Sequence, residues 1–158
     1  MELEHEFILL KKSKINLEKP NSIKVSRDDR EVNSDIVRLH DAFVHYIHDT
    51  LQWINSLNPD TNEADINISL YGGTMIDDKT VFTTKAMFES LYKLFSNAPE
   101  GIELNGGYTY IKGEVQNGKY EKVLLDKAEL LTKLNELIKL CTLVEESHGE
   151  LCIFHFGV

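Results

Sequence analysis

The side chains best suited to chemistry are Asp41, His45 and His48, which lie in a segment whose apolar spacing predicts a helix. Residues three and four apart share one side of a helix, and these three lie away from the apolar stripe. Carboxylate and imidazole groups bind metals, so the cluster suggests a metal site or an enzyme active site. A solvated helix face gives the same pattern. We expect that simpler arrangement, with no metal and no cofactor.

A second candidate is a cysteine–histidine pair, Cys152 and His155, in a predicted strand over 151–156. Residues three apart on a strand point to opposite faces, so we expect no catalytic dyad. The two cysteines, Cys141 and Cys152, lack metal-ligand spacing and predict buried, reduced thiols. The sequence also lacks the G-x-S-x-G, P-loop and H-E-x-x-H signatures. A non-enzymatic function is therefore favoured.

Two Asn-Gly pairs, at 105–106 and 117–118, sit between segments of alternating apolar residues. Asn-Gly suits a two-residue type I′ turn, because both central residues need a positive φ. The pattern predicts a three-strand meander over 101–104, 107–116 and 119–125. In that register Glu114 lies opposite Glu121, and like charges in this position are destabilising.

The predicted meander has one apolar face and one polar face. The apolar face, which we expect to be buried, carries Ile102, Leu104, Thr109, Ile111, Val115, Tyr120 and Leu124. The polar face carries the residues that we expect to bind a partner, namely Glu103, Tyr108, Tyr110, Glu114 and Glu121. Tyrosine is enriched at protein interfaces. A partner that presents Lys or Arg would relieve the repulsion between the two glutamates. The polar face therefore predicts a docking surface for a basic protein.

The remaining pattern predicts the elements that position these residues. Strands are expected over 4–11, 22–26, 65–71, 74–82 and 151–156. Helices are expected over 35–57, with Ser34 as N-cap, and from 83 or 84 to 97. A third helix is expected from the Asp126-x-x-Glu129 capping pattern to 147. The fold class is α+β, with an antiparallel or mixed sheet and about three helices packed on it. We expect one domain over 1–158, with 1–30 as a peripheral strand or an arm.

Composition sets limits on the partner. The chain has 17 basic and 26 acidic residues, a formal net charge of −9, which argues against a nucleic acid or an anionic membrane surface. No segment has transmembrane length and the N-terminus lacks a signal-peptide pattern, so a cytoplasmic location is expected. An acidic surface favours a basic partner and speeds its encounter.

In size and charge the chain resembles the small acidic immunity proteins and antitoxins with which bacteria block nuclease toxins. This resemblance implies an inhibitor of a basic toxin or nuclease that binds without catalysis. Two alternatives remain open. One is a small-molecule or metal-dependent enzyme that uses the polar residues of the first helix. The other is a homo-oligomeric structural protein that pairs through an edge strand or the tyrosine-bearing face.

Overall fold

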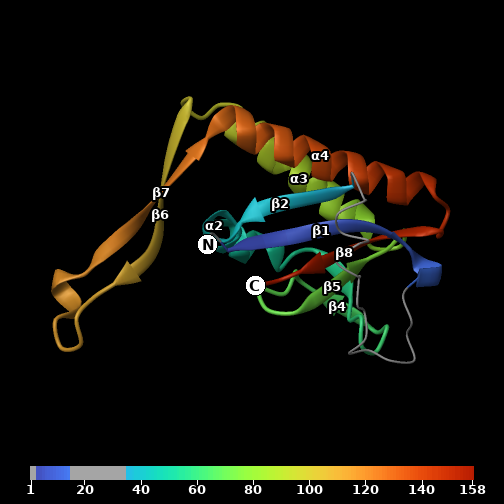
Figure 1. Cartoon of the computed structure of the whole chain (residues 1–158), viewed down its shortest axis with the longest axis horizontal. Helices are drawn as coiled ribbons and strands as arrows, with labels where there is room; N and C mark the ends of the chain where they lie inside the picture. Colours follow the sequence, from blue (N-terminus) through green and yellow to red (C-terminus); the bar gives the residue numbers. More distant parts are fainter. Residues whose placement is uncertain (1–2, 15–34) are drawn as a thin grey trace.

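The computed structural model describes residues 3–14 and 35–158 (Figure 1). The predicted strand over 22–26 and the predicted cap Ser34 lie outside the described residues. The α+β class is confirmed: within the described residues, three α-helices accompany an antiparallel sheet and a separate pair of antiparallel strands.

The sheet has six strands in the order β2-β1-β8-β5-β3-β4, and every neighbouring pair is antiparallel. Its strands are β1 (Glu4–Lys11), β2 (Ile36–His40), β3 (Asn55–Leu57), β4 (Ala64–Ile66), β5 (Gly73–Ile76) and β8 (Leu151–Phe156). The predicted strands at 4–11 and 151–156 are confirmed. They pair with each other near the centre of the sheet, so β1 is not peripheral.

Three helices, α2 (Asp41–Leu51), α3 (Val81–Phe95) and α4 (Lys127–Glu146), share one core with one face of the sheet. In Figure 1 α3 and α4 lie side by side along the sheet. Phe7, Val37 and Ile153 of the sheet belong to this core with helix residues such as Phe88 and Leu134. The alternate strand residues form a second apolar cluster, which contains Ile8, Leu10, Met75, Cys152 and Phe154.

Helix α4 begins as its capping pattern predicts. The Asp126 carboxylate accepts the backbone N–H of Glu129 at 2.8 Å and satisfies a donor that the first helical turn leaves unpaired. The helix ends at Glu146, and Gly149 follows with a φ of +91°, a conformation that glycine adopts without strain.

The prediction of a helix over 35–57 was wrong at both ends. Residues 36–40 form β2, in which Val37 and Leu39 are buried and the strand pairs with β1. The apolar spacing fits a helical stripe, but alternation and pairing with β1 decide in favour of a strand. The helix begins at Asp41, where the His40 Nδ1 atom accepts the backbone N–H of Ala42. Residues 55–57 at its predicted end form β3.

The two middle strands are shorter than predicted. The strand expected over 65–71 is β4, which covers only Ala64–Ile66, and the strand expected over 74–82 is β5, Gly73–Ile76. Helix α3 then starts at Val81, earlier than expected. Asp77 explains this early start, because its carboxylate accepts the backbone N–H groups of Lys79 and Thr80 and turns the chain toward the helix.

Antiparallel strands occupy the 101–125 segment as predicted, but there are two strands rather than three. Strands β6 (Gly101–Thr109) and β7 (Lys119–Asp126) pair with each other alone. Asn105-Gly106 is not a turn: it lies inside β6, where the register shifts between Asn105 and Tyr108. The two glycines of this shift allow a β-bulge, which competes with a turn for the same sequence. Asn117-Gly118 lies in a longer loop with a short 3₁₀ helix over Val115–Asn117.

Candidate functional site

Strands β6 and β7 form a hairpin, residues 101–126, that projects away from the rest of the molecule (Figure 1). Among the described residues, the base of the hairpin is the part that reaches the core: Ile102 is buried, and Leu104 and Leu125 pack against the main core. Every residue from Gly107 to Asn117 is exposed. The outer half of the hairpin therefore contributes little to the core, and its side chains face solvent.

Cross-strand pairing divides the hairpin into two faces. The pairs Glu103–Leu124, Asn105–Lys122 and Tyr108–Tyr120 define what we call the outer face. The pairs Ile102–Leu125 and Leu104–Val123 define the inner face, which turns toward the body of the molecule. Because residues alternate along a strand, Glu121 belongs with the inner face.

Large apolar side chains on and beside the outer face are open to solvent. Tyr120 is 56% exposed, Tyr110 is 54% exposed and Leu124 is 74% exposed. The ring centre of Tyr108 lies 4.9 Å from that of Tyr120 and 6.1 Å from that of Tyr110. These three rings form an aromatic cluster that no other element covers in the described part of the chain.

The aromatic cluster is held in place by the loop at the tip. The Tyr108 hydroxyl donates to the backbone carbonyl of Val115 at 2.8 Å. A Cβ atom on Gly118 would lie 2.5 Å from the Tyr108 ring, so only glycine leaves room for the ring in this position. The orientation of Tyr108 is therefore fixed by specific contacts although the ring is 40% exposed.

The structure brings together only part of the predicted docking set. Tyr108 and Tyr110 lie side by side, and Glu103 shares their face but forms an ion pair with Lys122 at 2.8 Å. Glu114 lies in the tip loop, outside β6 and β7, and is not paired with Glu121. The predicted repulsion between these two glutamates is therefore wrong.

Two residues of the outer face, Tyr120 and Leu124, were assigned to the buried face by the predicted register. The loop at the tip explains the error. A two-residue turn at Asn117-Gly118 would place Tyr120 opposite Val115, whereas the longer loop pairs Tyr120 with Tyr108, and this change of register exchanges the two faces of β7. The correct pairing could be found in the sequence only by treating Gly106-Gly107 as a bulge, with Tyr108 opposite Tyr120.

A groove of about 460 Å³ separates the inner face of the hairpin from α2, and we call it the hairpin groove. It is lined on the helix side by Asp41, Ala42, His45 and Tyr46, and on the hairpin side by Asn105, Gly106, Gly107, Glu121 and Val123. Asp41 and Glu121 thus approach one groove from two elements. The groove carries carboxylates suited to a cationic side chain, with the exposed Tyr46 ring beside them.

Asp41 is oriented from behind by two buried histidines. The His5 Nε2 atom lies 3.0 Å from the Asp41 Oδ1 atom, and the His5 Nδ1 atom lies 2.9 Å from the His155 Nε2 atom. Burial, with a smaller contribution from the neighbouring His5, lowers the pKa of His155 to about 3. Burial also lowers the pKa of His5, against the opposing effect of Asp41. Both rings are therefore neutral at neutral pH.

Neutral rings fix the direction of the hydrogen bonds. The carboxylate of Asp41 only accepts, so His5 donates through Nε2–H and accepts through Nδ1 from the Nε2–H of His155. The Nδ1 atom of His155 is then a buried acceptor, and it has no hydrogen-bond partner. This Asp41–His5–His155 chain connects α2, β1 and β8. Sequence reasoning missed it, since no local motif links His5 with His155.

The other predicted chemical groups do not converge. The His45 Nε2 atom lies 3.6 Å from Asp41 Oδ1, and no contact joins His48 to this pair within the described residues. Over residues 3–14 and 35–158, no three His, Cys, Asp or Glu side chains are arranged to hold a metal ion.

Cys152 packs in the second apolar cluster, whereas His155 contacts Phe7 on the other face of β8, as predicted. Burial raises the pKa of both Cys141 and Cys152 to about 12.

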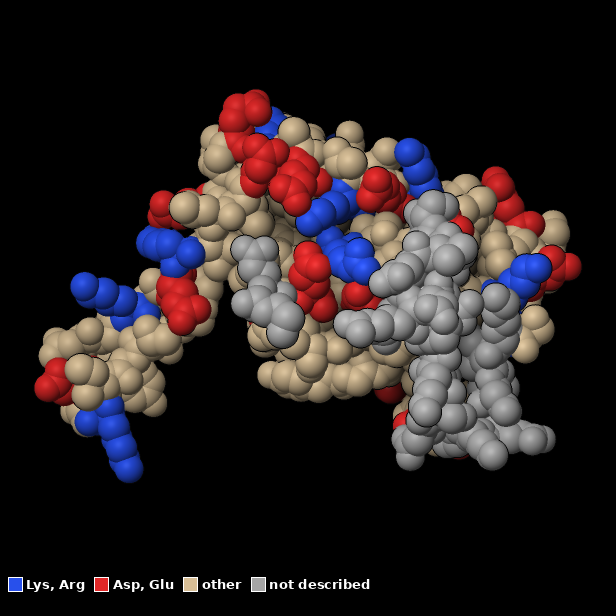
Figure 2. Space-filling view, viewed as in Figure 1, with Lys and Arg blue, Asp and Glu red and all other residues tan. Residues whose placement is uncertain are grey.

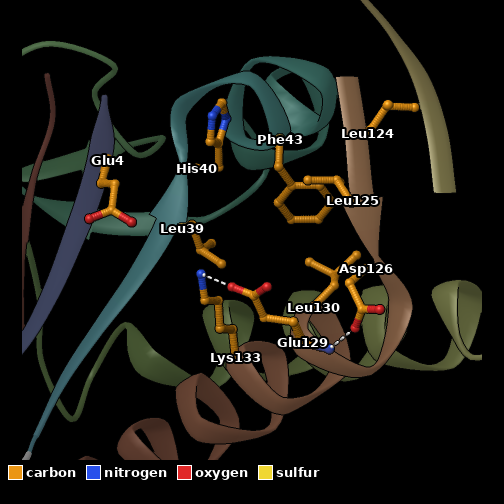
Figure 3. Close-up of a pocket in the computed structure, with 10 residues that line it drawn as sticks. All are labelled: Glu4, Leu39, His40, Phe43, Leu124, Leu125, Asp126, Glu129, Leu130 and Lys133. Carbon is orange, nitrogen blue, oxygen red and sulfur yellow. Dashed lines mark hydrogen bonds and ion pairs between the residues drawn. The ribbon is translucent and has the colours of Figure 1, made fainter. Parts of the chain in front are cut away.

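A second groove, of about 260 Å³, lies where the hairpin base meets β1, β2 and α4, and we call it the base groove (Figure 3). Glu4, Asp126 and Glu129 contribute carboxylates to it, and Lys133 pairs with Glu129 at 2.9 Å. Carboxylates therefore outnumber ammonium groups here. Figure 2 shows acidic side chains gathered where the hairpin joins the body of the molecule.

Comparisons of the chain with models of known protein families, with curated proteins and with solved structures found no significant match. Within the described residues, no helix combines the length and the apolar character that crossing a membrane requires. The function is therefore inferred from the hairpin and from the two grooves at its base.

Proposed function

We propose that this chain is a non-enzymatic protein-binding protein and that the hairpin is its docking element. The observation that carries the proposal is the exposure of large apolar side chains on a projecting two-stranded ribbon, namely Tyr108, Tyr110, Ile111, Val115, Tyr120 and Leu124. Contiguous exposed apolar residues are typical of interaction sites. Tyrosine contributes a rigid anchor at low entropic cost, with a polar tip that finds a partner at the interface.

The charges at the hairpin base favour a basic partner. Asp41 and Glu121 line the hairpin groove, and Glu4, Asp126 and Glu129 line the base groove. The whole chain has a formal net charge of −9, which steers a basic protein toward these grooves and raises its association rate. This combination supports a role like that of an immunity protein or antitoxin, an inhibitor of a basic toxin or nuclease. A cytoplasmic location agrees with two buried free cysteines.

An enzyme that uses the first helix receives less support. Asp41 and His45 do line the hairpin groove, but the hydrogen-bonded chain behind Asp41 leads into the core and ends at a buried nitrogen. These contacts orient a carboxylate for binding. The same groove therefore supports recognition of a cationic group more directly than catalysis.

Photo-cross-linking in cells that naturally contain the protein tests this proposal. A photoreactive phenylalanine analogue is placed at position 110 on the hairpin or, as a matched control, at position 71 on the body, where Tyr71 is 72% exposed. We expect position 110 to cross-link one basic protein and position 71 to cross-link it weakly or not at all. Equal cross-linking at both positions, or no specific product at position 110, would contradict the proposal.

A further inference from the structure

The tip of the hairpin has a charge opposite to that of its base. Lys112 lies in the tip loop and Lys119 is the first residue of β7, and within the described residues neither has an ion-pair partner, whereas Lys122 is paired with Glu103. Figure 2 shows both basic and acidic side chains along the hairpin and a gathering of acidic side chains where it joins the body. At the tip, the two lysines outnumber the one carboxylate, Glu114. The tip thus combines exposed rings with free ammonium groups, and the hairpin groove combines a ring with carboxylates.

The two complementary surfaces cannot meet within one chain. The hairpin itself forms one wall of the hairpin groove through Asn105, Gly106, Gly107, Glu121 and Val123. Its tip points away from the body of the molecule (Figure 1), and no residue from Tyr108 to Tyr120 lines that groove. A tip can therefore enter only the groove of another molecule.

We infer that two copies of this chain associate by reciprocal docking, in which the hairpin tip of each copy lies in the hairpin groove of the other. Lys112 and Lys119 then face Asp41 and Glu121 of the second copy, and the tip rings pack near Tyr46. A two-fold arrangement forms each contact twice. Ionic strength near physiological values screens the repulsion between two acidic bodies more than it weakens pairs in contact.

This inference goes beyond the proposed function and does not depend on it. The second copy would cover the same hairpin surface that a partner binds, so this surface is not accessible in the dimer. A partner would then compete with self-association. In the absence of a partner, the dimer would keep the exposed apolar residues of the hairpin covered.

Disulfide trapping between chains tests the arrangement. Chains with Tyr110→Cys are mixed with longer, tagged chains that carry His45→Cys, or Tyr71→Cys as a control on the body. The native Cys141 and Cys152 do not compete, because both are buried and burial raises their pKa to about 12. We expect several-fold more mixed disulfide with His45→Cys than with Tyr71→Cys. Equal yields would overturn the inference.

Sedimentation equilibrium of the full chain gives an independent readout. We expect a concentration-dependent dimer whose Kd rises at least about tenfold in the Lys112→Glu, Lys119→Glu double variant, because two ion pairs at each of the two reciprocal contacts are replaced by repulsion. The Lys93→Glu, Lys139→Glu double variant, at exposed positions on α3 and α4, serves as a charge-matched control and should shift the Kd much less. A wild-type chain that stays monomeric, or equal shifts in both variants, would overturn the inference. Either outcome would leave the photo-cross-linking experiment to decide the proposed function separately.

Discussion

The body of the molecule buries many large apolar residues in a core, although some, such as Tyr71, are exposed, whereas the outer half of the hairpin buries none of its large apolar residues. In the body, Phe7 and Phe88 are each 1% exposed and Leu134 is 0% exposed. On the outer face of the hairpin, Tyr120 is 56% exposed and Leu124 is 74% exposed. Packing accounts for the first set, but it does not account for the second. The difference indicates that the hairpin residues serve contacts that the isolated chain does not make.

The two regions also differ in how their polar groups are used. In the body, the buried chain Asp41–His5–His155 is neutral at its inner end and joins three elements. On the hairpin, Lys112, Glu114 and Lys119 are exposed and have no ion-pair partner within the described residues. Buried polar groups must be paired inside the molecule, whereas exposed charges remain available to another molecule.

The strongest test of this contrast compares one leucine from each region. Leu134→Ala should lower the free energy of unfolding by about 2–5 kcal/mol, because it leaves a cavity between α4 and the rest of the core. Leu124→Ala should change it by less than about 0.5 kcal/mol, because this side chain is 74% exposed. Chemical denaturation measures both values. Similar losses in the two variants would show that the hairpin is part of the core.

Acid should weaken the body through His155. Its pKa is about 3 in the folded chain, below the ordinary value of 6.5, so the unfolded chain binds a proton first as the pH falls. Stability attributable to this group is therefore complete above pH 6.5 and declines below it, by at most about 1.4 kcal/mol per pH unit. Denaturation at pH 7 and pH 5 should show a smaller difference in His155→Gln than in the wild type.

A control keeps this pH experiment specific. His148 is exposed and lies in the left-handed region with a φ of +50°, which asparagine tolerates. His148→Asn should keep the wild-type dependence of stability on pH. If His155→Gln and His148→Asn both follow the wild-type profile, the buried histidines are not the groups responsible.

Much of the fold could be predicted, because several elements carry strong local signals. The capping pattern at Asp126 and a long apolar stripe predicted α4, and the runs at 4–11 and 151–156 predicted β1 and β8. Local pattern was insufficient where partners decide the structure. Residues 36–40 are a strand because β1 pairs with them, and no signal within that segment specifies this partner.

The site was less predictable than the fold, because it depends on register and on distant pairs. Tyr108 and Tyr110 could be named as docking residues from residue type alone. Tyr120 could not be placed beside them until the length of the tip loop, which pairs Tyr108 with Tyr120, was known. His5 and His155 are 150 positions apart along the chain, so no local motif indicates their contact.

Shortening the hairpin tests the central claim most directly. Asn105 pairs with Lys122, so residues 106–121 can be replaced by a two-residue Asn-Gly turn that retains the anchored base. We expect a free energy of unfolding within about 1 kcal/mol of the wild type, since the removed residues are almost all exposed. Capture of the protein that cross-links at position 110 should be lost. A shortened chain that unfolds, or that still binds this protein with wild-type affinity, would contradict the account.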